Sequence, residues 1–132
     1  MRRETIIGEL TTGLGEAAGF TTLDWAVAAF RDRLGIEAWP GTVNVVVRGP
    51  ENRAAWERVK SWSGIVLPPP RPDWCSSRCY HARINDSLAA AIVLPEVDSY
   101  PDDKMELIAA VAVRETLNLE DGDLLRIAVE AP

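Results

Sequence analysis

Six short apolar or β-branched segments constrain the fold of this chain most. They follow one another without a regular pattern of helical crossovers. The clearest is residues 42–47, which follows the turn signal Trp39-Pro40-Gly41 and is rich in valine. Because few helices separate the strands, a parallel doubly wound sheet is disfavoured. The pattern predicts a mainly β fold, a closed or nearly closed barrel with peripheral helices. The six predicted strands are residues 5–12, 42–47, 79–84, 88–94, 105–109 and 124–129.

Three helices are predicted beside these strands, at residues 24–34, 51–62 and 112–117. In the first, Leu23, Val27, Phe30 and Leu34 recur at helical spacing and would form one apolar face. Thr21 or Thr22 is the expected N-cap, and Gly35 the expected stop. In the second helix, Trp56 and Val59 are expected on the buried side.

The length and the charge of the chain limit the classes of function that it can have. Its 132 residues suit one domain, residues 1–132. The net charge of -6 argues against a nucleic-acid partner. No apolar run approaches the length of a membrane span, so we expect a cytoplasmic protein with no membrane partner. Any phosphate site must therefore be built locally, from backbone N–H groups, a few basic side chains and a metal.

Thr42 and Asn44 form the first candidate site. Side chains alternate along a strand, so these two residues should share one face while Val43, Val45 and Val47 occupy the other. A hydroxyl and a carboxamide oxygen are hard, neutral ligands that suit Mg²⁺, with nucleotide phosphates completing its shell. The alternative is that both are ordinary polar residues at a strand edge.

Two further segments carry polar groups in unusual places. Gly13-Leu14-Gly15-Glu16 follows the first strand and could bring backbone N–H groups close to a ligand, although a glycine pair is most often just a turn. Glu106 lies inside an apolar strand, where a carboxylate needs a partner or a ligand. Arg114 could meet phosphate. An internal ion pair between Glu106 and an arginine is an equal alternative.

Other residues are less informative. Cys75, Cys79 and His81 are too few for a structural zinc site, and we interpret them as ordinary thiols and a solvated histidine. The five tryptophans could stack on an aromatic ligand, although core or interface positions are the more usual role. They are Trp25, Trp39, Trp56, Trp62 and Trp74.

Taken together and in order, these segments resemble the archaeal CTP-dependent riboflavin kinase family over roughly residues 6–129. The matching motifs include Gly13-Leu14-Gly15-Glu16, Pro40-Gly41-Thr42-Val43-Asn44, Glu106-Leu107-Ile108-Ala109, Arg114-Glu115 and Leu119-Glu120-Asp121-Gly122-Asp123. Further matches are Phe30, Leu34-Gly35-Ile36, Cys79-Tyr80 and Ile92-Val93-Leu94-Pro95.

The resemblance implies a six-stranded cradle-loop barrel that transfers the γ-phosphate of CTP to riboflavin, giving FMN and CDP. By position, Thr42 and Asn44 would bind Mg²⁺, and Glu106 and Ser99 would contact the flavin, with Glu106 also a tentative catalytic group. The two nucleotide-binding loops would be Gly13, Leu14, Gly15, Glu16, Ala17 and Ala18, and then Val111, Ala112, Val113 and Arg114.

The chain departs from the family pattern in its first loop. Ala17, Ala18 and Gly19 stand where the family has a further glycine and an aromatic residue, and the flavin-contacting threonine is at best Ser99. Two alternatives follow: a catalytically degenerate flavin- or nucleotide-binding module, or an effector domain that acts with a partner chain. The sequence does not fix the oligomeric state.

Overall fold

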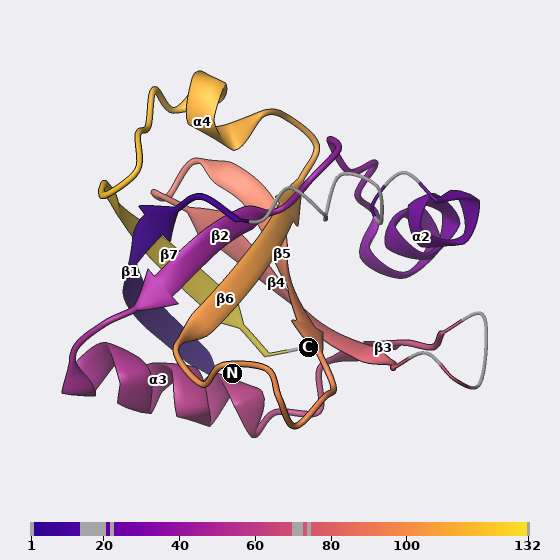
Figure 1. Cartoon of the computed structure of the whole chain (residues 1–132), viewed down its shortest axis with the longest axis horizontal. Helices are drawn as coiled ribbons and strands as arrows, with labels where there is room; N and C mark the ends of the chain where they lie inside the picture. Colours follow the sequence, from indigo (N-terminus) through magenta and orange to yellow (C-terminus); the bar gives the residue numbers. More distant parts are fainter. Residues whose placement is uncertain (1, 14–20, 22, 70–72, 74, 132) are drawn as a thin grey trace.

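The fold is a closed antiparallel β-barrel, as the strand pattern predicts (Figure 1). The computed structural model describes residues 2–13, 21, 23–69, 73 and 75–131. The strands are β1 (Arg3–Thr11), β2 (Val43–Val47), β3 (Ile65–Leu67), β4 (Ser77–Ile84), β5 (Leu88–Pro95), β6 (Lys104–Ala109) and β7 (Leu124–Glu130). Six of them form a ring in the order β4-β5-β6-β2-β1-β7, and the pairing of β7 with β4 closes it.

The short strand β3 was not predicted from the sequence. It pairs with the first residues of β4, where Ile65 lies opposite Cys79, whereas β7 pairs with the last residues of β4. One edge of β4 therefore serves two partners, β3 outside the ring and β7 within it. All pairings in the sheet are antiparallel.

The inward-facing side chains of the strands fill the barrel. Ile6, Val45, Leu107 and Ile127 are at most 1% exposed. The helix α3 (Pro50–Lys60) lies across one end of the barrel and adds Trp56 and Val59 to this core, as its apolar spacing predicts. The short helix α4 (Val113–Thr116) lies at the opposite end (Figure 1).

A second core lies outside the barrel wall. Helix α2 (Asp24–Ala29) and the π-helical turn η1 (Phe30–Leu34) pack Phe30 and Leu34 against the outer side of β5 and β6, where Val93 and Ile108 are buried. Strand β5 is thus covered on both faces, which explains its continuous apolar sequence. No helix in the described part of the chain is long and apolar enough to cross a bilayer.

The helical segment observed at residues 24–34 differs in detail from the predicted helix. It ends at Gly35 with a positive φ of 71°, as expected, but its last turn is π-helical. Leu23 and Val27 are 40% and 37% exposed, because the segment presents Ala26 to the barrel instead. The expected cap is wrong for Thr21, because Leu23 is the N-cap residue of α2 and no side chain caps the helix there. The Thr21 hydroxyl accepts a hydrogen bond from the Gly41 N–H at 2.8 Å. Thr22 lies outside the described residues.

Candidate functional site

The polar residues singled out in β2 and β6 meet on the outer wall of the barrel. In the register of the sheet, Asn44 lies opposite Glu106 on one side and Thr11 on the other. Val45 and Val47 point into the core, so the expected alternation along this strand is confirmed. Thr42, which directly precedes β2, donates a hydrogen bond from its hydroxyl to Glu106 Oε1 at 3.2 Å.

The partners of Glu106 are hydroxyl groups. Its second carboxylate oxygen, Oε2, accepts a hydrogen bond from the Tyr100 hydroxyl at 2.7 Å. Among the described residues Glu106 has no arginine partner, so the alternative of a Glu106–arginine ion pair finds no support there, and Arg114 is bound to Thr11 and Asp121. A half-buried carboxylate that accepts two such hydrogen bonds is compensated for its partial loss of hydration.

Tyr100 is a site residue that the sequence analysis missed. Burial, followed by the hydrogen bond to Glu106 and the charge of that carboxylate, raises the pKa of the Tyr100 phenol well above its ordinary value. The phenol is therefore a donor across the physiological pH range. The ammonium group of Lys104 lies 5.3 Å from the centre of its ring. The neighbouring Ser99 is exposed, in the turn that precedes Tyr100.

Asn44 lies directly against Gly13 at the end of β1. A Cβ atom built on Gly13 would lie 2.4 Å from Nδ2 of Asn44 and 3.0 Å from its Oδ1. A side chain at position 13 would therefore displace the Asn44 carboxamide. Asn44 Nδ2 also donates to the Thr42 carbonyl oxygen at 3.3 Å, which leaves Oδ1 as the atom to coordinate a ligand.

A second cluster connects the end of β1 to α4. The Arg114 guanidinium donates to the Thr11 carbonyl at 3.0 Å and pairs with Asp121 at 2.6 Å, and Thr12 donates its hydroxyl proton to the same carboxylate. The segment that leads into the first predicted nucleotide loop is therefore tied to the second. From the sequence we expected that Arg114 could meet a phosphate, but nothing there indicated its pairing with Asp121.

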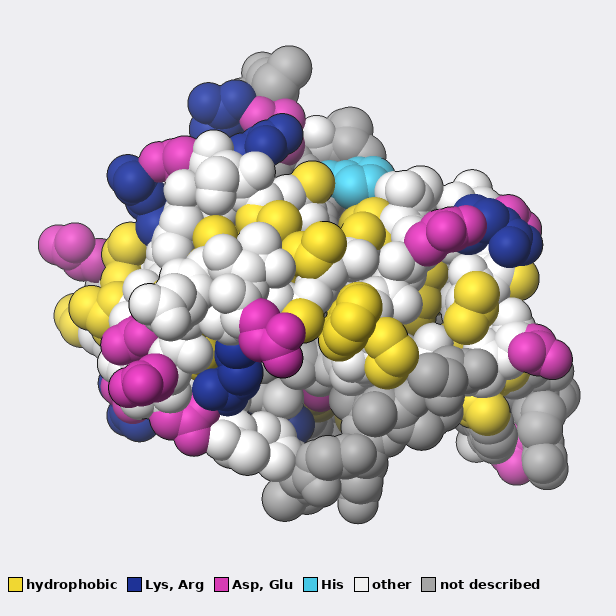
Figure 2. All heavy atoms as spheres, turned by 90° about the horizontal axis from the view of Figure 1, so that it is seen from above, with side chains coloured by type: hydrophobic (Ala, Val, Ile, Leu, Met, Phe, Trp, Pro, Cys, Tyr) yellow, Lys and Arg dark blue, Asp and Glu magenta, His cyan; other side chains and the backbone are white. Residues whose placement is uncertain are grey.

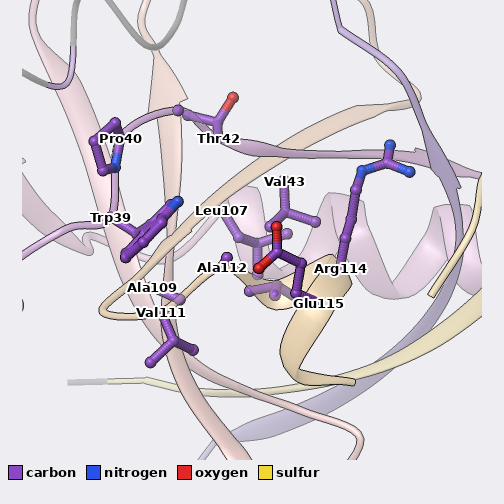
Figure 3. Close-up of a pocket in the computed structure, with 12 residues that line it drawn as sticks. Trp39, Pro40, Thr42, Val43, Leu107, Ala109, Val111, Ala112, Arg114 and Glu115 are labelled. Atoms are coloured by element: carbon purple, nitrogen blue, oxygen red, sulfur yellow. The ribbon is translucent and has the colours of Figure 1, made fainter. Parts of the chain in front are cut away.

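A hollow of about 210 Å³ opens between the start of β2 and α4. Figure 3 shows Trp39 and Thr42 along one side, Arg114 and Glu115 on the other, and Val43 and Leu107 at the base. All four residues of the second predicted nucleotide loop, from Val111 to Arg114, line it. The remaining members of the first loop, Leu14, Gly15, Glu16, Ala17 and Ala18, lie outside the described residues.

The residues around Thr42 and Asn44 fit a magnesium ion in chemistry, because both offer neutral oxygen atoms beside the Glu106 carboxylate. Within the described residues, no three histidine, cysteine or acidic side chains form a group that could hold a metal by themselves. Such a site would therefore depend on the phosphates of a nucleotide.

The segment of the two cysteines lies apart from these clusters. Cys79 is buried between β5 and the helical segment, and burial raises the pKa of its thiol to about 12. Cys75 is exposed, and His81 Nε2 lies 2.9 Å from the Leu34 carbonyl oxygen. The structure thus places Cys79 in a packing role.

Asp121 provides a testable dependence of stability on pH. The hydrogen bond from Thr12 and then the hydrogen bond from Arg114 lower the pKa of its carboxyl below the ordinary 3.8. This contribution to stability is present above the ordinary pKa and is lost as pH falls through the folded-state pKa. Urea unfolding between about pH 5 and about pH 2.5 should show a slightly steeper loss for the wild type than for Asp121→Asn. If the stability of both proteins fell equally with pH, Asp121 would not have this role.

The comparison with known proteins decides the family. A model named CTP-dep_RFKase, described as domain of unknown function DUF120, matches residues 10–129. The chain belongs to the CTP-dependent riboflavin kinase family. The chain is also similar to the riboflavin kinase of Methanobrevibacter smithii, with 36% identity over 123 residues, covering 92% of this chain and 97% of that protein.

Two further proteins that are similar to this chain differ in length. The riboflavin kinase of Sulfurisphaera tokodaii is 34% identical over 130 residues, covering 94% of this chain and 93% of its own. That of Methanocella arvoryzae is 35% identical over 125 residues, but this chain spans only 56% of its length. The barrel described here thus corresponds to nearly all of some relatives and about half of others.

Proposed function

We propose that this chain is a riboflavin kinase that transfers the γ-phosphate of CTP to the 5′-hydroxyl of riboflavin, giving FMN and CDP. The observation that supports the proposal is the close approach of Asn44 to Gly13, because Asn44 is a proposed metal ligand and Gly13 is the first residue of the proposed nucleotide loop. Family membership supports the same chemistry. The protein would act in the cytoplasm.

Thr42 and Asn44 would hold a magnesium ion together with the nucleotide phosphates. Thr42 donates its proton to Glu106, so its oxygen lone pairs are free to face a cation. A bound magnesium ion would supply charge neutralisation on the phosphate oxygens. Gly13 to Ala18 and Val111 to Arg114 would position the nucleotide, so that catalysis is mainly orientation and electrostatic stabilisation.

Ser99 and Glu106 would contact riboflavin. Two hydrogen bonds occupy part of the Glu106 carboxylate, which has about four lone-pair positions. It can therefore also accept a hydrogen bond from a ribityl hydroxyl, and a role as proton acceptor would use the same oxygen atoms. The polar outer wall of β6 is the proposed flavin side of the site.

The test is direct. Purified protein is incubated with riboflavin, Mg²⁺ and either CTP or ATP, and FMN is separated by chromatography. FMN formation with CTP is the expected result. Binding of riboflavin or CTP in a calorimeter without FMN formation from any nucleoside triphosphate would contradict a kinase and favour the degenerate binding module.

Replacing Tyr100 with phenylalanine tests whether the Tyr100 hydroxyl holds Glu106 in place for riboflavin. The variant loses a hydrogen bond to a charged group, an interaction of about 1.5–3 kcal/mol, so kcat/KM for riboflavin should fall about ten-fold. The KM for CTP should change much less, because Tyr100 supports the flavin side.

Tyr80→Phe is the matched control for this variant. Tyr80 is fully buried in the barrel, and its hydroxyl donates to the Trp62 carbonyl at 3.1 Å. That variant should lower the free energy of unfolding by about 1 kcal/mol without a change in kcat/KM. Equal kinetic effects of the two substitutions would remove the specific role of Tyr100.

A further inference from the structure

The Asp121 carboxylate lies between the two segments proposed to bind the nucleotide. Figure 2 looks onto the α4 end of the barrel, where acidic and basic side chains lie beside one another around a mainly hydrophobic middle. Arg114, on α4, places its Nη2 atom 2.6 Å from Asp121 Oδ1. The hydroxyl of Thr12, directly before the first proposed loop, donates a hydrogen bond to Asp121 Oδ2. Asp121 itself belongs to the turn between α4 and β7, outside both loops.

Backbone hydrogen bonds fix the turn that carries Asp121. The Gly122 N–H donates to the Leu10 carbonyl, and the Leu10 N–H donates to the Asp123 carbonyl, both at 2.8 Å. The Asp123 carboxylate also accepts a hydrogen bond from the Glu120 N–H at 2.8 Å, which closes the turn on itself. The turn is thus attached to the end of β1, and the Asp121 carboxylate has a defined position from which to hold a neighbouring side chain.

The guanidinium of Arg114 has donors to spare for a further partner. Among the residues that the structure describes, its polar partners are the Thr11 carbonyl, at 3.0 Å, and Asp121, and both are bound through Nη2. A guanidinium has five N–H donors, so the others remain for phosphate oxygens. Binding a phosphate costs less conformational entropy when the arginine is already held in one orientation.

Stability alone is a weak reason for this ion pair. The side chains of Arg114 and Asp121 are 41% and 53% exposed, and exposed ion pairs contribute little to the free energy of unfolding. The geometry is better suited to orientation. Thr12 fixes one oxygen of the carboxylate, and the other oxygen then faces Arg114.

We propose that Asp121 is a positioning residue for phosphate transfer, which holds Arg114 in the orientation that meets the phosphates of the nucleotide. The inference rests on the proposed kinase function and adds a residue that would act through Arg114 without touching a substrate. Thr12 would fix the carboxylate, and the next residue, Gly13, lies against the proposed metal ligand Asn44. One carboxylate would thus keep Arg114 in register with the metal side of the site.

The first test is Asp121→Ala, assayed for FMN formation with CTP and riboflavin. The KM for CTP should rise about five-fold, because Arg114 must then be immobilised when the nucleotide binds. The KM for riboflavin should stay the same. Asp121→Asn keeps one acceptor oxygen and should show a smaller rise. Titration of CTP into each variant by calorimetry gives the same comparison without turnover.

Asp86→Asn is the matched control for Asp121→Asn. Asp86 lies in the turn between β4 and β5 and forms an exposed ion pair with Arg126, also at 2.6 Å. Asparagine suits its positive φ of 60°, so the control removes the charge without straining the turn. Asp86→Asn should leave the KM for CTP unchanged, although it weakens an ion pair of the same kind.

The double variant Asp121→Ala/Arg114→Ala shows whether Asp121 acts through Arg114. Arg114→Ala alone should raise the KM for CTP at least about ten-fold, because it removes a charged hydrogen-bond donor. The double variant should match Arg114→Ala within about two-fold, since the residue that Asp121 positions is already absent. Multiplication of the two effects would show that Asp121 acts independently of Arg114.

The outcomes separate the positioning role from the kinase function. If the wild type forms no FMN with any nucleotide, the kinase function fails. If the wild type is active with CTP and Asp121→Ala keeps the wild-type KM for CTP, the kinase stands and the role of Asp121 is wrong. A lower KM for CTP in Asp121→Ala would show that Asp121 competes with the phosphates for Arg114, and it would also overturn the proposal.

Discussion

Replacing Asn44 with alanine should lower the rate of FMN formation at least about a hundred-fold, because it removes a carboxamide oxygen proposed to hold the metal beside the phosphates. The barrel should remain folded. Asn44 is half-buried on the outer wall, and its hydrogen bond to the Thr42 carbonyl is long, at 3.3 Å. The measurements are FMN formation under saturating CTP and riboflavin, and urea unfolding of the same preparation.

Val46→Ala is the matched control for Asn44→Ala. Val46 lies two residues further along β2, is also half-buried, and pairs with Lys104, away from Glu106. Its substitution should change turnover by less than about two-fold. Titration of Mg²⁺ in the presence of CTP measures metal binding independently of turnover. Only Asn44→Ala should weaken the binding of Mg²⁺. Full activity of Asn44→Ala would remove this residue from the metal site.

Replacing Gly13 with alanine should lower the rate of FMN formation by a similar factor, for a steric reason. The new methyl group would lie 2.4 Å from Asn44 Nδ2, well inside contact distance, so the carboxamide must move. Because the atoms that the methyl group meets are the end of a side chain, the loss of stability should lie at the low end of the about 1–3 kcal/mol that overpacking costs. The displaced carboxamide should also lower turnover about a hundred-fold, since errors of about 1 Å in a positioned group have such effects.

The double variant Gly13→Ala/Asn44→Ala separates the two effects. Removing the carboxamide makes room for the methyl group, so the double variant should recover most of the stability lost by Gly13→Ala. Its turnover should stay as low as that of Asn44→Ala. If the two stability losses simply add, Gly13 and Asn44 do not interact as the structure places them.

Much of the fold could be predicted because short-range patterns determine it. The alternation of residues 42–47 predicts which side chains enter the barrel, and Val45 and Val47 do so. All six predicted strands form, and the helix of residues 51–62 buries Trp56 and Val59 as its spacing indicates. These features depend on the periodicity of strands and helices, which neighbouring residues reveal.

Less of the candidate site could be predicted, because its contacts join residues far apart in the chain. Glu106 was recognised as a carboxylate that needs partners, but the hydroxyls of Thr42 and Tyr100 that bind it are decided by the pairing of β6 with β2 and by the loop before β6. The link between Arg114 and Asp121 is likewise a product of tertiary packing.

The sequence by itself determined the strand order along the chain, the inward and outward faces of β2, and the end of the first helical segment at Gly35. Only the tertiary structure decided that β7 closes onto β4, that the Asn44 carboxamide lies against Gly13, and that Trp39 and Glu115 line one hollow. The reason is physical: periodicity is a local property of the chain, whereas ring closure and close contacts depend on which distant segments share a surface.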